Sequence, residues 1–351
     1  IFSYLFFWSF SEKLIIYLIG TTFLTHHICI WMDTMDKRDK RKKRVFQLGI
    51  LLLLGTILCL KYRNFFFGNV SKLAMVLHID WSYQDQLIFL PIGISFYTLS
   101  AIGYMADVYW GKVKAEYSLV KTALFLGFFP VIVEGPICRW EDVEDTLFKN
   151  ESVKAENVFK GCYRIIWGLF KMIIADRLAV LVDKVYVGYE SYSGAVIVVA
   201  AISYTIQLYM EFSGCMDMVI GSAGLFGIRL PENFSQPFFA KTCTDFWKRW
   251  HITLGVWFKN YIFYPVSISK TARKWNKFTR KHFKGDFGKY VARMGIAAMA
   301  LFPVWISNGL WHGPKWNYIF YGLYYFGLIF MGLALEPVRD RILAVLHINP
   351  E

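Results

Sequence analysis

The stretch LIIYLIGTTFLTHHICIW, residues Leu14–Trp31, contains no Asp, Glu, Lys or Arg. An α-helix rises about 1.5 Å per residue, so about twenty apolar residues cross the roughly 30 Å hydrocarbon core of a bilayer. Because water-soluble domains seldom contain such a run, this stretch predicts a transmembrane helix.

Comparable apolar runs recur along the chain and predict further helices that span the membrane or insert deeply into it. They are Val45–Tyr62, Leu87–Met105, Ser118–Val133, Val158–Leu181, Ser193–Phe212, Val291–Leu310 and Trp316–Leu335. Two other segments, Met216–Ile228 and Ile252–Val266, are too short or too polar for a simple crossing, and we expect them to be re-entrant or interfacial. The sequence therefore predicts an all-α polytopic membrane protein.

The composition supports the same class of protein. Of the 351 residues, 56% are hydrophobic and 19% are aromatic, which leaves too little polar surface to cover a soluble globule. The longest polar stretches have the length of loops, so we predict a single integral-membrane domain over residues 1–351, with N-terminal transmembrane helices in residues 1–89. No cleavable signal peptide is evident, and the start at Ile1 suggests that part of a first helix is missing.

The net charge of +13 is concentrated beside the apolar runs. DKRDKRKKR, Asp36–Arg44, lies between two runs, and KTARKWNKFTRKHFK, Lys270–Lys284, precedes another. Short basic loops next to transmembrane helices are typical of the cytoplasmic side. We therefore expect contact with membrane lipid and no nucleic-acid partner, since neither basic run lies within a base-stacking fold.

The cysteines give no sign of a disulfide framework or a zinc site. All six are scattered, mostly in apolar stretches, and no CxxC pair occurs. We interpret them as small buried side chains.

Polar residues inside the apolar body gather from Glu134 onward. Placing a charged side chain in hydrocarbon costs on the order of 3 kcal/mol or more of free energy, so each one is expected to have an ion-pair partner or a functional role. Pro130 and the Gly135–Pro136 pair should unwind a helix near Glu134. Glu134 could then pair with Arg139, as a structural ion pair or as part of a pocket wall.

A second polar cluster follows in MEFSGCMDMVIGSAGLFGIRL, Met210–Leu230. Its small residues should permit close helix packing. Glu211 and Asp217 could pair with cations such as Arg229, or could line an aqueous cavity.

Two of the seven histidines differ from the rest in their surroundings. His251 and His312 each follow a tryptophan and lie among polar residues in otherwise apolar segments. Gly313 and Pro314 should end a helix just before them, which places the His312 ring at a helix end beside a cavity. A neutral imidazole there can take a proton, as a general base must. The other histidines, interpreted as structural or solvated, are His26, His27, His78, His282 and His347.

The residues alone leave several functions open. Paired histidines favour a membrane transferase, and a transporter that uses a histidine as a proton relay is the main rival. Metal binding ranks below both, because no constellation such as HExxH accompanies the histidines, and we expect no metal site. No GxSxG elbow is present, although Ser307 could act as a nucleophile. The transporter is disfavoured because we find no internal repeat with paired broken helices.

Within DFWKRWHITL, residues 245–254, helical spacing would turn Trp247 and Trp250 toward lipid or neighbouring helices. The same spacing would turn Lys248, His251 and Thr253 toward a cavity. The segment could therefore present an aromatic face and a polar face.

Longer motifs carry a family resemblance. PENFSQPFFAKTCTDFWKRWHITLGVWFKNYIFYP, followed downstream by NGLWHGPKWNYIFYG, resembles the membrane-bound O-acyltransferase (MBOAT) family. LPIGISFYTLSAIGYMADVYWG, FFPVIVEGPICRW and FSGCMDMVIGSAGLFGIRLPENF match the same bacterial branch in order. That branch contains the alginate O-acetyltransferase membrane subunit and the teichoic acid D-alanyl transferase. The resemblance covers roughly Leu90 to Leu335.

The resemblance implies a fold and residue roles. The family fold is a ring of tilted transmembrane helices, with re-entrant segments, around a central tunnel. The family's catalytic histidine falls on His312, which would deprotonate the acceptor hydroxyl, and its second histidine falls on His251, which would bind or orient the acyl donor. Further substrate-binding residues are expected at Asp245, Lys248, Arg249, Trp311 and Asn308. Lys248, Arg249 and Lys259 could neutralise the phosphates of an acyl carrier, or could snorkel to lipid headgroups.

The implied activity is O-acyl transfer in the bacterial inner or plasma membrane, with no bound cofactor. The donor would be acetyl-CoA at the cytoplasmic face, and the acceptor a hydroxyl of an extracytoplasmic polysaccharide or a partner protein. MEFSGCMDMVIG and LPENFSQPFF favour the alginate-type acetyltransferases, whereas IFYPVSISK lacks the glycine-rich ending common in them. The alternative is D-alanyl transfer from a carrier-protein thioester, and a separate extracytoplasmic transferase could complete delivery.

Overall fold

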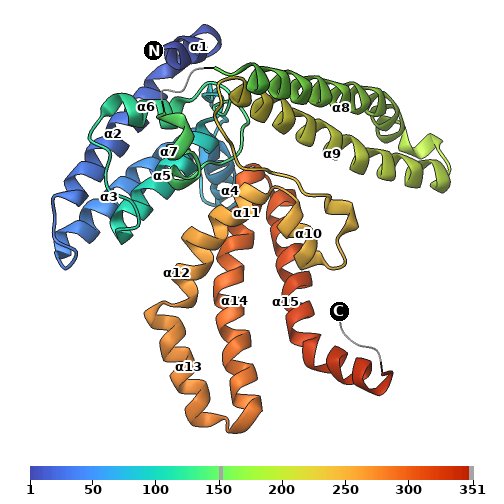
Figure 1. Ribbon diagram of the computed structural model, residues 1–351. Helices are drawn as coiled ribbons and strands as arrows, with labels where there is room; N and C mark the ends of the chain where they lie inside the picture. The colour runs from blue at the N-terminus through green and yellow to red at the C-terminus, as the bar shows by residue number, and fades with distance from the viewer. Residues whose placement is uncertain (150–152, 348–351) are drawn as a thin grey trace. The chain divides into compact units, whose positions relative to one another are not determined.

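The computed structural model describes residues 1–149 and 153–347, and these are almost entirely helical (Figure 1). Within these ranges no β-strand forms, and a single antiparallel bridge joins Phe234 to Trp250. Helical stretches long and apolar enough to cross a membrane are Phe2–Asp33, Lys40–Val76, Gly194–Leu225, Gly285–His312 and Trp316–Val345. The prediction of an all-α membrane protein is confirmed, while the ring around a tunnel stays a prediction.

Residue contacts divide the chain into two compact units, which we describe separately. The first contains Ile1–Thr56, Leu90–Ser235 and Trp250–Thr253, and the second contains Ile57–Phe89, Gln236–Arg249 and Leu254–Glu351.

The first unit contains the following helices: α1 (Phe2–Ser11), α2 (Ile15–Asp33), α3 (Lys40–Ile57), α5 (Ile94–Trp110), α6 (Leu119–Gly127), α7 (Trp140–Leu147), α8 (Ala155–Val187) and α9 (Gly194–Leu225). Its core forms around α5, which is buried from Tyr97 to Val108. The Tyr104 ring is fully buried and stacks on Trp140, with centroids 4.7 Å apart. Aromatic packing thus fixes α7 against α5.

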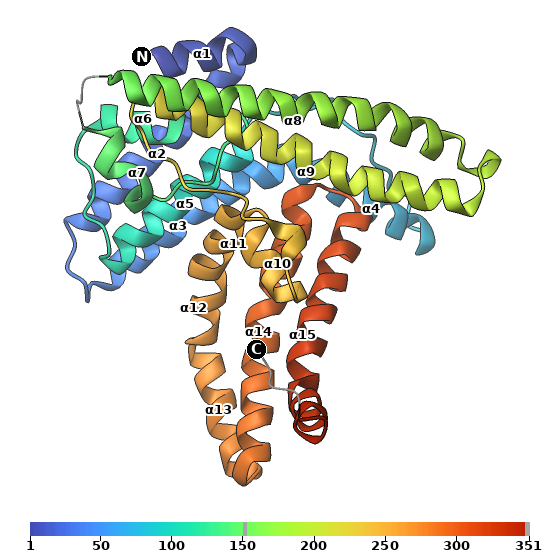
Figure 2. The same cartoon turned by 45° about the vertical axis from the view of Figure 1, so that its right-hand side comes forward.

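α8 and α9 form a long hairpin (Figure 2). Close glycine contacts and ion pairs hold its two helices together. A Cβ on Gly168 would lie 2.6 Å from the Gly214 carbonyl oxygen, so the backbones approach too closely for any side chain. Between the helices, Asp217 accepts from Lys171 Nζ at 2.6 Å and lies 3.0 Å from Arg164 Nη2. The expected close packing is confirmed, but the partners of Asp217 are on α8, and Arg229 is not among them.

The second unit starts with a π-helical turn (Leu58–Tyr62). The elements that follow are α4 (Arg63–Val76), α10 (Cys243–Arg249), most of α11 (Ile252–Phe258), a second π turn (Lys259–Phe263), α12 (Tyr264–Ser267), α13 (Lys270–His282), α14 (Gly285–His312) and α15 (Trp316–Val345). α13 packs back along the first part of α14, and α15 packs along its length (Figure 1). The basic run at Lys270 is therefore mainly a helix and not a loop.

Several predicted boundaries are wrong. Leu87–Met105 begins with irregular backbone, because Pro91 and Gly93 (φ 72°) delay the start of α5 to Ile94. Ser118–Val133 holds only the nine-residue α6 before a series of turns. Met216–Ile228 is not re-entrant, since α9 continues to Leu225. Ile252–Val266 is helical throughout, as α11, a π turn and α12 in direct succession, and its re-entrant or interfacial placement stays a prediction.

The predicted ion pair between Glu134 and Arg139 is also wrong. Arg139 is the N-cap residue of α7 and binds the first turn of that helix, with Nη1 2.5 Å from Glu141 and Nη2 2.6 Å from Asp142. Such local carboxylates are closer in sequence and satisfy the guanidinium. Glu134 instead accepts a contact from Cys215 Sγ at 3.6 Å.

Candidate functional site

His251 occupies a break between two helices of the chain. α10 ends at Arg249 and α11 begins at Ile252. His251 itself has φ 48°, in the left-handed region that non-glycine residues seldom adopt. The expected single helical face from Trp247 to Thr253 is therefore wrong, because the backbone reverses its hand at the histidine.

Asn233 stabilises this break. Its backbone carbonyl accepts from Ile252 N at 3.0 Å, and its side-chain Oδ1 accepts from Thr253 N at 3.0 Å. Oδ1 also accepts from Thr253 Oγ1 at 2.7 Å and lies 3.4 Å from His251 Nδ1. Asn233 is fully buried, so one residue binds both the ring of His251 and the two residues that follow it.

These bonds fix the protonation pattern of His251. The backbone N–H of Thr253 can only donate, so the Asn233 atom that it meets is the amide oxygen. Thr253 Oγ1 accepts from Ile137 N at 3.0 Å and thus directs its own hydrogen to Asn233. Because Oδ1 only accepts, His251 Nδ1 carries a hydrogen and Nε2 is the basic nitrogen of the neutral ring.

Packing holds the His251 ring in one orientation. The residue is 5% exposed, and its ring meets Phe212 edge to face at 4.8 Å. Trp250 beside it packs on Phe234 at 5.1 Å and on Tyr209 at 6.1 Å. Trp250 therefore faces protein, as the sequence predicts.

His312 is the last residue of α14, and a close helix crossing determines its position. A Cβ on Gly309 would lie 2.3 Å from the Tyr318 carbonyl oxygen, and one on Gly322 would lie 2.3 Å from that of Trp305. The two glycines bring α14 and α15 into backbone contact directly before the histidine. The predicted break at Gly313 is confirmed.

Two rings of α15 lie against His312, which is itself exposed. Tyr318 stacks near it at 6.1 Å and Tyr321 meets it edge to face at 5.6 Å. The Tyr321 ring also lies 6.4 Å from Trp247 of α10. Tyr321, which sequence reasoning missed, thus links the helix that carries Asp245, Lys248 and Arg249 to the catalytic candidate.

Lys61 and Tyr62 hold the end of α14. Lys61 Nζ donates to the Trp311 carbonyl at 2.6 Å, and Tyr62 Oη donates to that of Leu310. The last carbonyls of a helix have no intrahelical partner, and a cation there is favourable. Both residues were missed, although a lone lysine at the end of an apolar run is a usable signal.

Asn308 lies one turn before His312 and on the same helix face. It is 6% exposed, and its Oδ1 has no hydrogen-bond partner among the described residues. A buried acceptor in that state costs about 1–3 kcal/mol. A donor at this position, such as a hydroxyl group, would relieve that cost. Trp311 packs its ring under Lys61, with Nζ 5.6 Å from the ring centroid.

Asp245, Lys248 and Arg249 share α10. Arg249 Nε donates to Asp245 at 3.0 Å, and this bond holds the pKa of the carboxyl below its ordinary value. Lys248 is exposed. Lys259, in the π turn, lies 5.5 Å from the centroid of the Tyr264 ring.

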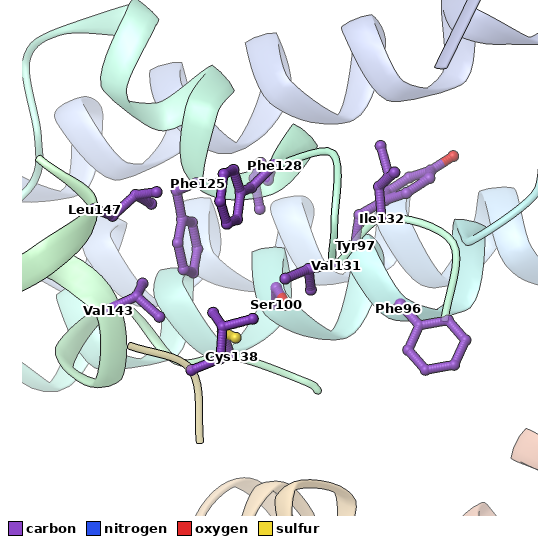
Figure 3. A pocket seen from close by; sticks show the side chains of 12 residues that line it. Phe96, Tyr97, Ser100, Phe125, Phe128, Val131, Ile132, Cys138, Val143 and Leu147 are labelled. Atoms are coloured by element: carbon purple, nitrogen blue, oxygen red, sulfur yellow. The ribbon is translucent and has the colours of Figure 1, made fainter. Parts of the chain in front are cut away.

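Hollows occur in both units. In the first, a pocket among α5, α6 and α7 holds only about 20 Å³ and is lined mainly by apolar side chains, including Phe125 and Val143 (Figure 3). It suits core packing and not a substrate. In the second, a hollow of about 540 Å³ has Arg280, Lys289 and Arg293 in its wall. In the part of the chain that the structure describes, no three His, Cys, Asp or Glu side chains are grouped for a metal ion.

Comparison with known proteins agrees with the family resemblance. Residues 113–282 match the model of MBOAT, the membrane-bound O-acyltransferase family. A probable alginate O-acetylase AlgI of Pseudomonas putida is 31% identical over 335 residues, which are 95% of this chain and 63% of the relative. The corresponding protein of Pseudomonas aeruginosa is 31% identical over 99% of this chain and 62% of its own length.

Relatives with other acceptors also match. A teichoic acid D-alanyltransferase of Bacillus subtilis is 30% identical over 67% of this chain and 56% of the relative. The chain thus spans about three fifths of the length of the curated relatives that it matches. With its apolar helices and these matches, the chain is a multi-pass membrane protein that carries a domain of the membrane-bound O-acyltransferase family over residues 113–282.

Proposed function

We propose that the protein is a membrane O-acyltransferase. It takes an acyl group, acetyl by preference, from acetyl-CoA on the cytoplasmic side and passes it to a hydroxyl of an extracytoplasmic polysaccharide or of a partner protein. The proposal is supported by relatives named as alginate O-acetylases and as a peptidoglycan O-acetyltransferase of Helicobacter pylori. The observation that carries it is the setting of His312.

His312 stands at the opposite end of α14 from the basic helix α13. α13 carries Lys270, Arg273, Lys274, Lys277, Arg280 and Lys281. The positive-inside rule assigns that end to the cytoplasm. α14 has 28 residues, so His312 lies about 40 Å away, on the extracytoplasmic side, where a surface glycan is available.

His312 and Asn308 have complementary roles in the proposed reaction. His312 accepts the proton of the acceptor hydroxyl while the hydroxyl oxygen attacks the thioester carbonyl. Asn308 Oδ1 orients that hydroxyl. The carbon–sulfur bond then breaks, the acyl–oxygen bond remains, and the proton leaves with the CoA thiol. The step needs no metal and no covalent acyl-enzyme.

Cationic residues bind the phosphates of the acyl donor. Lys248 and Arg249 project from α10. The Trp247 ring of that helix lies 6.4 Å from Tyr321, and Tyr321 in turn contacts His312. Guanidinium and ammonium groups suit the phosphates of CoA. His251 is a positioning residue for the donor, with Nε2 as its basic nitrogen.

The test is acetyl transfer by the purified protein in liposomes. Radiolabelled acetyl-CoA is supplied with cell-envelope glycan, and label on the glycan is measured for wild type, His312→Ala and the control His282→Ala. We expect wild type and control to transfer and His312→Ala to fail while it stays folded. Full transfer by His312→Ala would exclude the base mechanism.

The D-alanyl relatives support a second candidate, in which the donor is a carrier-protein thioester. The same liposomes with a D-alanyl carrier thioester separate the two. Transfer from the carrier but not from acetyl-CoA would replace acetyl by D-alanyl and leave the role of His312 unchanged.

A further inference from the structure

A polar hollow of about 690 Å³ lies in the second unit beside the loop that follows His312. Its wall comes from α4, from the irregular segment after α4 and from residues 314–316 at the start of α15. Ligand pockets in proteins have volumes of about 300–1,000 Å³, so the hollow is large enough for one or two sugar rings.

The two faces of α4 differ sharply in character. Phe66, Val70 and Leu73 are exposed at helical spacing, and such a stripe suits lipid. Asn64 and Ser71 line the hollow on another face. Because α4 belongs to an apolar stretch long enough to cross a membrane, polar groups on it need protein or water as neighbours. The hollow is therefore suited to an aqueous ligand.

The wall is preformed by hydrogen bonds. Tyr83 Oη donates to Asn64 Oδ1 at 2.9 Å, and Tyr83 N donates to Ser71 Oγ at 3.1 Å. Trp316 Nε1 donates to Asn69 Oδ1 at 2.9 Å. These bonds tie both aromatic side chains to α4, so their rings are held in place before any ligand arrives.

The chemistry of the wall suits a hydroxyl-rich ligand. Trp316 is 54% exposed and offers an apolar ring, on which the C–H face of a sugar can pack. Gln84, Asp85, Lys72 and Lys315 are exposed around it and provide both donors and acceptors. A site for a phosphate alone would have no use for the Asp85 carboxylate, which repels anions.

The hollow lies at the correct end of α14 for an acceptor. Lys61 and Tyr62, just before α4, bind the carbonyls of Trp311 and Leu310. The hollow therefore belongs to the His312 end, opposite the basic helix α13. By the positive-inside rule that end is extracytoplasmic.

We propose that this hollow binds the glycan that receives the acyl group. A sugar ring packs on Trp316, and its hydroxyls bond to Gln84 and Asp85, so that a neighbouring hydroxyl reaches His312. The inference rests on the proposed function and adds to it the place and the chemical class of the acceptor.

The test separates acceptor binding from donor chemistry. In nanodiscs, acetyl transfer to an oligouronate and to an oligomer of N-acetylglucosamine is measured for wild type, Gln84→Ala/Asp85→Ala, Trp316→Leu and the control Asp183→Ala on α8. We expect the first two variants to raise KM for at least one oligosaccharide about tenfold and to leave KM for acetyl-CoA unchanged. The exposed Asp183 should have no effect.

Direct binding gives a result that does not need turnover. Saturation-transfer NMR with the same oligosaccharides should show contact in wild type and its loss in both hollow variants. Binding without any acetyl transfer would refute the proposed activity and keep the hollow as a glycan site. Unchanged KM and binding in both variants would overturn the inference, as would effects that follow the anionic lipid content of the nanodiscs and not the sugar.

Discussion

The neighbourhoods of His251 and His312 differ in almost every physical respect. His251 is buried, has left-handed backbone and is bonded through Nδ1 to Asn233. His312 is exposed at a helix end, near a buried amide oxygen of Asn308 that lacks a partner. The first is built to hold one orientation, whereas the second leaves room for a changing ligand. Two histidines with similar sequence surroundings therefore have different structural environments.

Kinetics of the two histidines provide the largest expected contrast. His312→Ala should lower kcat about a hundredfold or more, because a general base contributes at that level. His251→Gln should act mainly on KM for acetyl-CoA, by about tenfold, if it positions the donor. Steady-state rates in liposomes measure both. Equal effects on kcat would remove the distinction between the two sites.

Removal of the Asn233 side chain should destabilise the backbone break at His251 and free the His251 ring. Asn233→Ala leaves two Thr253 groups and His251 without their shared acceptor, and we expect a loss of about 2–3 kcal/mol in stability. Thermal unfolding in detergent measures this, with the exposed Asn317→Ala as control. Nitrogen NMR of labelled histidine should show that His251 loses its fixed Nδ1–H form. Retention of that form would mean that packing, and not Asn233, sets the tautomer.

The position of His312 should depend on the helix crossing. Gly309→Ala places a methyl group 2.3 Å from a backbone oxygen, so we expect a cost of about 1–3 kcal/mol and a lower kcat. Gly332→Ala on α15 has no atom within 4 Å and should stabilise by up to about 1 kcal/mol through helix propensity. A tolerated Gly309→Ala would show that the two helices can separate without harm to the site.

The smallest effect is expected at Asp245. Both partners of its pair with Arg249 keep about a third of their side-chain surface in solvent, so Asp245→Asn should change transfer less than about twofold. Since Arg249 lowers the pKa of the carboxyl, the pair stabilises above the ordinary pKa and weakens only as the pH falls through the lowered folded value. Unfolding measured against pH checks this. A large loss of donor affinity would instead assign Asp245 to substrate binding.

Features set by local sequence were predictable, and those set by distant contacts were not. The end of α14 follows from Gly313 and Pro314, and the helices follow from apolar runs. The break at His251 depends on Asn233, eighteen residues earlier, and no local pattern shows that bond. The sequence did not predict the full length of α9, because an unpaired Asp217 would mark the end of an apolar helix. Its partners, Arg164 and Lys171, lie on α8 and only the structure shows them.

The pairing of Asp217 also constrains how the protein is made. Arg164 and Lys171 on α8 precede it in the chain, so they leave the ribosome before their counter-ion exists. A lone charge in hydrocarbon costs on the order of 3 kcal/mol. α8 should therefore wait at the insertion machinery until α9 is synthesised, and the hairpin should enter the bilayer as one piece.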